Sequence, residues 1–278
     1  MLKQRVITAL VLLAVLLPAL FAPIAWPFAV LTLMAIGAAG WEWARLNGVA
    51  GGGAAALGVA LAAACGVALA AGWAAAAPPL AWWVATLVWV LGGAWALRAG
   101  PAGWPGLSRG LRCVLGLVAL WTAWLALANA KSIGVNFILS IFCLVWAADI
   151  AAYFGGRTFG RRKLAPAISP GKSWEGVWSG MLGVLVLAAL WLWIDRSFAL
   201  DSMSLYSRLG ERLRMVGLAA PLVFLAAMSV VGDLVESLAK RSAGAKDSSQ
   251  LLPGHGGVLD RIDALLPVFP LALAMSSL

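Results

Sequence analysis

Apolar runs of about 20 residues recur almost without a break along this chain, and only short polar connections separate them. A helix needs a run of about this length to cross the hydrocarbon core of a bilayer. The pattern predicts nine spans, at residues 6–21, 28–44, 54–73, 80–97, 111–130, 133–154, 174–194, 215–238 and 258–278. With 63% hydrophobic and 11% charged residues, the composition excludes a soluble globular protein. We therefore predict an all-α polytopic membrane protein of about nine transmembrane helices.

Basic residues lie mostly on one side of the predicted membrane. Nine spans place the N-terminus and the connections after the even-numbered spans on one side, which receives fifteen of the 20 Lys and Arg residues. Because cytoplasmic loops accumulate Lys and Arg, we predict a cytoplasmic N-terminus, a cytoplasmic polar segment before the last span and a C-terminus on the far side. Topology accounts for the net charge of +9. The scattered basic residues form no stripe that would bind nucleic acid.

Residues 237–263 concentrate the polar chemistry between two apolar runs. They include Lys240, Arg241, Lys246, Asp247, Asp260, Arg261, Asp263 and the only histidine, His255. Charge this dense beside lipid is costly unless it faces water, a partner or a ligand. Glu236 and Lys240 are spaced for an ordinary i,i+4 ion pair. Asp233 has no basic residue at that spacing, so it needs another explanation.

Carboxylates at the same membrane boundary indicate a site for a divalent cation. Asp260 and Asp263 are three residues apart and point the same way from a helix. Together with Asp233, they predict hard oxygen ligands for a Mg²⁺ ion that handles phosphates. Asp149 lies inside an apolar run, where a carboxylate is either functional or paired with a basic residue of a neighbouring helix.

The connection after the sixth span combines glycine with positive charge. We expect Gly155, Gly156 and Gly160 to let backbone amides approach a ligand, and five basic residues indicate that the ligand is anionic and bears phosphate. These basic residues are Arg157, Arg161, Arg162, Lys163 and Lys172. Ser173 is placed to cap a helix that begins near Trp174, with Glu175 in its first turn.

The spacing of polar residues near the C-terminus resembles the signature of phosphatidate cytidylyltransferases, also called CDP-diacylglycerol synthases. The matching residues are Ser237, Lys240, Arg241, Lys246, Asp247, Leu252, Pro253, Gly254, His255, Gly256, Gly257, Asp260, Arg261 and Asp263. Two further stretches, residues 149–157 and 169–176, are also similar to this family. The sequence departs from the pattern at Gly171, where a second basic residue beside Lys172 is expected.

This resemblance implies transfer of the cytidylyl group from CTP to phosphatidic acid at the cytoplasmic face of a bacterial inner membrane. It divides one continuous membrane domain into an N-terminal scaffold, residues 1–131, and a C-terminal catalytic region, residues 132–278. It also implies Mg²⁺, a monovalent cation such as K⁺ beside it, and a homodimer. The implied catalytic residues are Lys172, Asp233, Lys240, Arg241, Lys246, Asp260 and Arg261. The implied substrate contacts are Gly155, Gly156, Arg157, Ser169, Ser173, Ser237, Asp247, His255, Gly256 and Gly257. The implied metal ligands are Asp233 and Asp260, followed by Asp263 and Asp149.

A transporter of a phosphorylated or anionic solute is the alternative from a different class of protein. Transporters of this kind place charges near the middle of the bilayer, at corresponding positions of two repeated halves. Here the acidic and basic residues gather in the second half and toward one membrane face. This distribution favours the enzyme.

Overall fold

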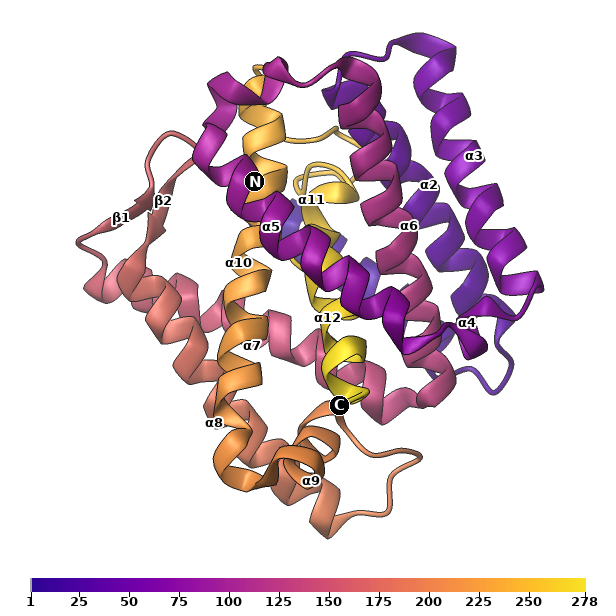
Figure 1. Cartoon of the computed structure of the whole chain (residues 1–278), viewed down its shortest axis with the longest axis vertical. Coiled ribbons are helices and arrows are strands. Elements are labelled where there is room, and N and C mark those ends of the chain that lie inside the picture. Colours follow the sequence, from indigo (N-terminus) through magenta and orange to yellow (C-terminus); the bar gives the residue numbers. More distant parts are fainter. Residues whose placement is uncertain (1) are drawn as a thin grey trace.

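The computed structural model describes the backbone of residues 2–278, and all side chains in that range except those of residues 2–6, Ala76 and Val216. Figure 1 shows an almost entirely helical molecule with one small hairpin at its edge. The helices are α1 (Leu2–Phe21), α2 (Trp26–Leu46), α3 (Gly51–Ala70), α4 (Trp73–Ala76), α5 (Pro79–Gly103), α6 (Arg109–Ile133), α7 (Val135–Phe159), α8 (Trp174–Ser197), α9 (Leu205–Gly217), α10 (Ala219–Ser242), α11 (Leu259–Ile262) and α12 (Leu265–Ser276). The hairpin pairs β1 (Lys163–Ala165) with β2 (Ser169–Ser173) in antiparallel fashion.

Among the described residues, seven helices are long and apolar enough to cross a membrane: α2, α3, α5 with the short turn that follows it, α6, α7, α8 and α10. The apolar part of α1, Ile7–Phe21, is shorter. This is an integral membrane protein, and the predicted all-α polytopic fold is confirmed. The predicted number of nine spans is approximate. Lys3 and Arg5, which entered the charge count, lie outside the described side chains.

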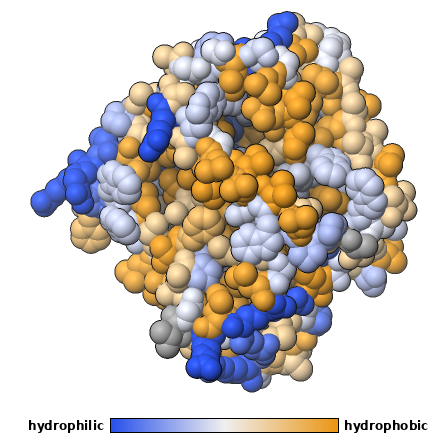
Figure 2. Space-filling view, viewed as in Figure 1, coloured by the Kyte–Doolittle hydropathy of each residue, from blue (hydrophilic) through white to orange (hydrophobic). Residues whose placement is uncertain are grey.

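The outer surface is the kind that lipid requires. Large apolar side chains are exposed on several helices, for example Leu80 (71%), Val59 (70%) and Leu182 (63%). Figure 2 shows hydrophobic side chains across much of one face, with hydrophilic ones gathered over the hairpin at the left edge and at the bottom of the view. An exposed apolar surface of this extent marks an interaction with membrane.

The predicted ninth span is wrong as a single helix. Residues 258–278 form the four-residue α11 and the 12-residue α12, with a break at Asp263 and Ala264. Pro267 explains the break, because proline has no N–H to donate to the carbonyl of Asp263 and fits well in the first turn of the helix that follows. At a rise of about 1.5 Å per residue, α12 is too short to cross a bilayer alone. Nearly all of α12 is buried, and it packs against α5, α6 and α10 in the centre of the molecule.

Helices α7 and α8 pack so closely that small residues are needed between them. The Ser179 side chain occupies the position that a Cβ on Gly155 would take, and backbone carbonyls of α7 lie 2.9 Å from the Cβ positions of Gly176 and Gly180. Close backbone approach through small residues is the usual basis of helix association in membranes. This pairing fixes the hairpin, which connects α7 to α8, beside the C-terminal half of α10 (Figure 1).

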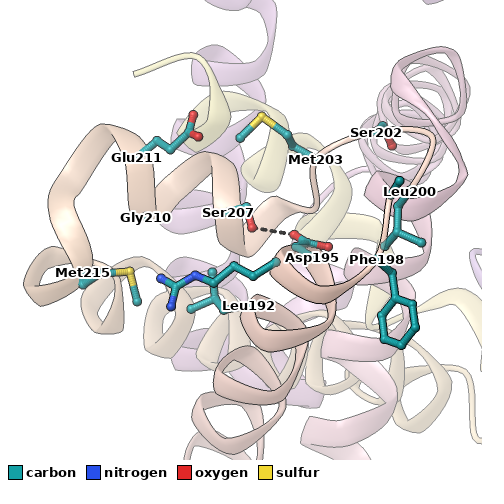
Figure 3. A pocket seen from close by; sticks show the side chains of 12 residues that line it. Leu192, Asp195, Phe198, Leu200, Ser202, Met203, Ser207, Gly210, Glu211 and Met215 are labelled. Carbon is teal, nitrogen blue, oxygen red and sulfur yellow. Dashed lines mark hydrogen bonds between the residues drawn. The ribbon is translucent and has the colours of Figure 1, made fainter.

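A pocket of about 660 Å³ lies at the other end of α8, between that helix and α9. On its wall, Asp195 accepts a hydrogen bond from the Ser207 hydroxyl at 2.5 Å (Figure 3). Asp195 also accepts from the Ser204 hydroxyl at 2.5 Å and from Asn136 Nδ2 at 2.9 Å. Glu211 lines the same pocket and is exposed. None of the residues predicted for the functional site lines this pocket.

Candidate active site

Two lysines pair with the acidic residues in the C-terminal half of α10. Lys172 Nζ lies 2.7 Å from Asp233 Oδ2 and joins β2 to α10. Lys240 Nζ lies 2.5 Å from Glu236 Oε2 and 2.5 Å from Asp260 Oδ1, and so joins α10 to α11. The predicted i,i+4 pair of Glu236 and Lys240 is therefore present, and both residues are buried. These contacts bring together three elements that lie far apart in the sequence.

The second carboxylate oxygen of Asp260 is enclosed by donors. Oδ2 accepts from the Ser248 N–H at 2.9 Å, the Ser248 hydroxyl at 2.7 Å and the Gly257 N–H at 2.7 Å. Burial acts to raise the pKa of Asp260, but the hydrogen bonds from Lys240, Gly257 and Ser248 outweigh it and lower that pKa to about 2. Asp260 is thus held ionised opposite Lys240. Gly256 has φ +77°, and a Cβ there would lie 2.7 Å from Asp260 Oδ2, so glycine is required.

Asp263 approaches Asp233 because the residue before Asp233 has no side chain. The backbone carbonyl oxygen of Asp263 lies where a Cβ on Gly232 would point. Asp263 Oδ1 accepts from the N–H of Ala264 at 2.7 Å, and Asp233 Oδ1 accepts from the Ser237 hydroxyl at 3.2 Å. The corner between α11 and α12 therefore packs against α10 directly before Asp233, and burial, followed by the charge of Asp233, raises the pKa of Asp263.

The hairpin holds Lys172 at this position through the start of α8. Ser173 caps α8 as predicted, because its hydroxyl accepts from a backbone N–H in the first turn at 3.2 Å. The Glu175 carboxylate turns back and accepts from the N–H of Arg161 at 3.0 Å and that of Arg162 at 3.2 Å. Both predictions for the first turn of α8 are confirmed, and together these bonds fix the strand that carries Lys172.

The loop after α10 carries the remaining signature residues. Arg241 donates to the carbonyl of Ile168 at 3.3 Å and to that of Ala245 at 3.1 Å, and so ties the hairpin turn to this loop. Lys246 and Asp247 line a pocket of about 720 Å³ between the loop and the C-terminal end of α2. This polar concavity adjoins the Asp260 network through Ser248, which also lines it.

The sequence matches the cytidylyltransferase family over residues 3–278. It is 41% identical over 282 residues to a phosphatidate cytidylyltransferase of Pseudomonas aeruginosa, with 99% of this chain and 97% of that relative covered. The chain belongs to the cytidylyltransferase family. A phosphatidate cytidylyltransferase of Haemophilus influenzae is 50% identical over 137 residues, which cover 49% of this chain and 44% of the relative. One of Brucella melitensis is 39% identical over 148 residues, with 50% and 46% covered.

These matches confirm the resemblance seen in the spacing of the polar residues. The protein is a membrane-embedded nucleotidyltransferase, which removes the transporter as an alternative. A cytidylyltransferase has to bind a highly charged nucleotide. The lysines and carboxylates in the C-terminal half of α10 and beside it are charged groups of the kind that such binding requires.

Two predicted ligand contacts of this cytidylyltransferase lie elsewhere than expected. Gly155 and Gly156 were expected in a loop, where their amides would approach a ligand, but both lie inside α7. Gly155 packs against Ser179, and a Cβ on Gly156 would lie 3.2 Å from the Ser173 hydroxyl. Their missing side chains therefore serve the contact between α7 and α8. The predicted loop placement was wrong because α7 extends to Phe159.

Several other predicted residues of this cytidylyltransferase are not held by ion pairs with other described residues. Asp149, Arg157 and Arg261 are exposed and form no ion pair within the described part of the chain. Ser169 is half-buried in β2. The turn around His255 is closed by a hydrogen bond from its N–H to the carbonyl of Leu252 at 2.8 Å. The exposed groups of Asp149, Arg157 and Arg261 are therefore free to meet a ligand.

The carboxylates predicted to bind metal in this cytidylyltransferase do not assemble as one cluster. Within residues 2–278, no group of three or more His, Cys, Asp or Glu side chains is arranged to hold a metal ion. Both oxygens of Asp260 are bonded to protein donors, and within the described part of the chain Asp149 forms no hydrogen bond with the other three carboxylates. Asp233 and Asp263 still offer oxygen donors from adjoining positions. Mg²⁺ is commonly bound by one or two carboxylates plus the phosphates of a substrate, and this pair fits that mode.

One buried carboxylate next to the site was not singled out from the sequence. Glu42 of α2 is 0% exposed. Its Oε1 accepts from the Ser249 hydroxyl at 2.5 Å and the Val258 N–H at 3.0 Å, and its Oε2 accepts from the Leu259 N–H at 2.6 Å. The Ser248 hydroxyl, which donates to Asp260, lies 3.3 Å from Oε2. The N-terminal half of the cytidylyltransferase thus contacts the signature segment directly.

Proposed function

We propose that this enzyme transfers the cytidylyl group of CTP to phosphatidic acid and releases pyrophosphate, with CDP-diacylglycerol as the lipid product. The observation that carries the proposal is the joining of β2, α10 and α11 by the pairs Lys172–Asp233 and Lys240–Asp260. Relatives named phosphatidate cytidylyltransferase, one of them aligned over nearly the whole chain, support this choice of substrates.

The reaction is an in-line displacement at phosphorus. An oxygen of the phosphatidate phosphate attacks the α-phosphorus of CTP, and the bond from that phosphorus to the oxygen bridging to the β-phosphate breaks. A phosphate monoester is already anionic near neutral pH, so positioning and charge neutralisation contribute more than a general base. Lys172, Lys240, Lys246, Arg241 and Arg261 supply positive charge for the phosphates and the leaving pyrophosphate.

Mg²⁺ is part of this proposal, with Asp233 and Asp263 as its protein ligands and the nucleotide phosphates completing its coordination. When bound, the ion neutralises charge on the triphosphate and fixes its geometry. Lys172 now lies against Asp233, and a cation at Asp233 would leave its ammonium group free to contact a phosphate. Asp260 stays with Lys240 and fixes the position of that lysine. A monovalent cation such as K⁺ is proposed from the resemblance alone.

We also propose a location and an assembly for the enzyme. The bias of basic residues supports a cytoplasmic N-terminus and active site and a C-terminus on the far side. The relatives are bacterial, which supports the inner membrane. A homodimer is proposed from the resemblance, and no nucleic acid is expected as a partner.

The direct test is an assay of protein purified in detergent, with labelled CTP, phosphatidic acid and Mg²⁺. We expect labelled CDP-diacylglycerol and an equal amount of pyrophosphate. Asp233→Asn should lower kcat by at least about 10²-fold, since each 1.4 kcal/mol of lost transition-state stabilisation costs about tenfold. Glu211→Gln, at the exposed far-side pocket, is the control and should behave as the native chain. No CDP-lipid from the native protein would refute the function, and full activity of Asp233→Asn would refute the site.

A further inference from the structure

Glu42 is the contact through which the N-terminal helices reach the signature segment. The carboxylate lies in α2, and its donors come from residues 248–259, which follow α10. An ionised carboxylate has about four acceptor positions and no proton to donate. Two backbone N–H groups and the Ser249 hydroxyl fill three of them, and the Ser248 hydroxyl lies near the fourth. The surroundings therefore present the donors that a carboxylate needs.

The chain also makes room for this carboxylate. A Cβ on Gly257 would collide with both the Glu42 carboxylate and the Ser248 hydroxyl. Since no lysine or arginine among the described residues pairs with Glu42, its charge is stabilised by hydrogen bonds alone. Hydrogen bonds to a charged group are stronger than neutral ones, and removing the acceptor leaves buried donors unsatisfied.

These bonds continue into the site. Glu42 fixes the N–H groups of Val258 and Leu259, directly before Asp260, and Asp260 fixes Lys240 at 2.5 Å. We infer that Glu42 is a positioning residue: it sets the place of Asp260 and thereby of Lys240 without touching the substrates. This inference rests on the proposed function for its kinetic consequences. The hydrogen bonds that Glu42 accepts from Val258 and Leu259 can be tested without measuring catalysis.

The test uses Glu42→Gln, which keeps the shape of the side chain but replaces one acceptor oxygen with a donor. Peptides covering residues 248–262 should exchange amide hydrogen faster in the variant, because Val258 and Leu259 bond to different oxygens of Glu42 and one of the two N–H groups would then face an amide NH2 instead of an acceptor. Peptides from the N-terminal half of α10 should exchange as in the native protein. Glu211→Gln makes the same chemical change at an exposed side chain with no hydrogen-bond partner among the described residues, so it should match the native protein in every measurement.

The kinetic expectation separates positioning from plain stability. A misplacement of about 1 Å can cost about 10²-fold in rate, so we expect kcat to fall by about that factor while KM for CTP changes less than about threefold. Glu42→Asp keeps the charge but shortens the side chain by one methylene, and it should rescue kcat only in part. A merely structural carboxylate would instead give folded Glu42→Gln protein with native kcat and reduced thermal stability, which would overturn the inference.

A milder variant covers the case in which Glu42→Gln does not fold. Ser249→Ala removes one donor to Glu42 and leaves the backbone bonds intact, and we expect a smaller loss of kcat, about three- to tenfold, with faster exchange in the same peptides. Native exchange and native kcat in Ser249→Ala would overturn the inference. If the native chain makes no CDP-lipid, the proposed function fails, while exchange in residues 248–262 still decides whether Glu42 holds the segment.

Discussion

Substituting Gly232 with alanine tests whether the approach of Asp263 to Asp233 matters for catalysis. A Cβ at Gly232 would lie 2.8 Å from Pro267 Cδ and closer still to the backbone carbonyl oxygen of Asp263. Ordinary van der Waals contact begins at 3.4 Å, so α10 and residues 263–267 must separate by at least about 0.6 Å at the proline ring. A proline ring and a backbone carbonyl cannot rotate away as a flexible side chain can, so the separation must move the helices.

The expected cost is larger for catalysis than for stability. Overpacking a well-packed contact costs about 1–3 kcal/mol, whereas replacing glycine with alanine inside a helix returns up to about 1 kcal/mol. The Gly232→Ala protein should therefore fold, with a net destabilisation of about 0–2 kcal/mol. Its two carboxylates would be displaced by an appreciable fraction of 1 Å, and we expect kcat to fall by about 10- to 100-fold.

The assay measures CDP-diacylglycerol formation at saturating CTP and Mg²⁺, together with thermal unfolding of the same preparation in detergent. Gly92→Ala is the matched control, because Gly92 lies within α5, is exposed and has nothing within 4 Å of its Cβ position. It should keep native activity and unfold no more easily than the native protein. If Gly232→Ala is folded and its kcat stays within about twofold of the native value, the geometry of this carboxylate pair does not govern the reaction.

Four further predictions follow from individual contacts. Ser173→Ala removes the cap of α8 and should destabilise the protein by about 1 kcal/mol, seen as a lower unfolding temperature; an unchanged temperature would contradict the capping role. Lys172→Met leaves Asp233 without its cation and should lower kcat/KM at least tenfold in the CTP assay; native kinetics would exclude Lys172 from the site. Chelation of Mg²⁺ should stop pyrophosphate release and added Mg²⁺ should restore it, whereas persistent release would contradict the metal proposal. Asp195→Asn weakens hydrogen bonds from three side chains and should cost about 1–3 kcal/mol of stability while kcat of the folded protein stays native; a lower kcat would link the pocket between α8 and α9 to catalysis.

The helical fold could be predicted because lipid imposes a simple requirement on sequence. A run of about 20 apolar residues is sufficient evidence for a spanning helix, and the seven spans found correspond to seven of the runs. The last run failed because its apolar composition concealed a break. Pro267 was a usable signal, since a proline interrupts a helix at the carbonyl four residues earlier. That carbonyl belongs to Asp263, so the break falls at a predicted metal ligand.

The candidate site could be predicted only where spacing within one element decides the contact. The pair of Glu236 and Lys240 follows from helical periodicity, and the cap at Ser173 follows from its place before α8. The partner of Asp233 could not be found in this way, because Lys172 comes from β2 and reaches α10 only through tertiary packing. The same holds for Asp260, whose contact with Lys240 depends on how the loop after α10 folds back.

Glu42 shows how the same sequence rule, applied evenly, would have found more of the site. Asp149 attracted attention because a carboxylate inside an apolar run is expensive and therefore functional or paired. Glu42 meets that criterion at least as well, since it lies in the predicted second span and is the only acidic residue before Asp149. The structure gives Glu42 three close donors from the signature segment and leaves Asp149 exposed. The sequence alone could not identify those donors. Two of them are backbone N–H groups, which every residue except proline has, so residue type does not distinguish them.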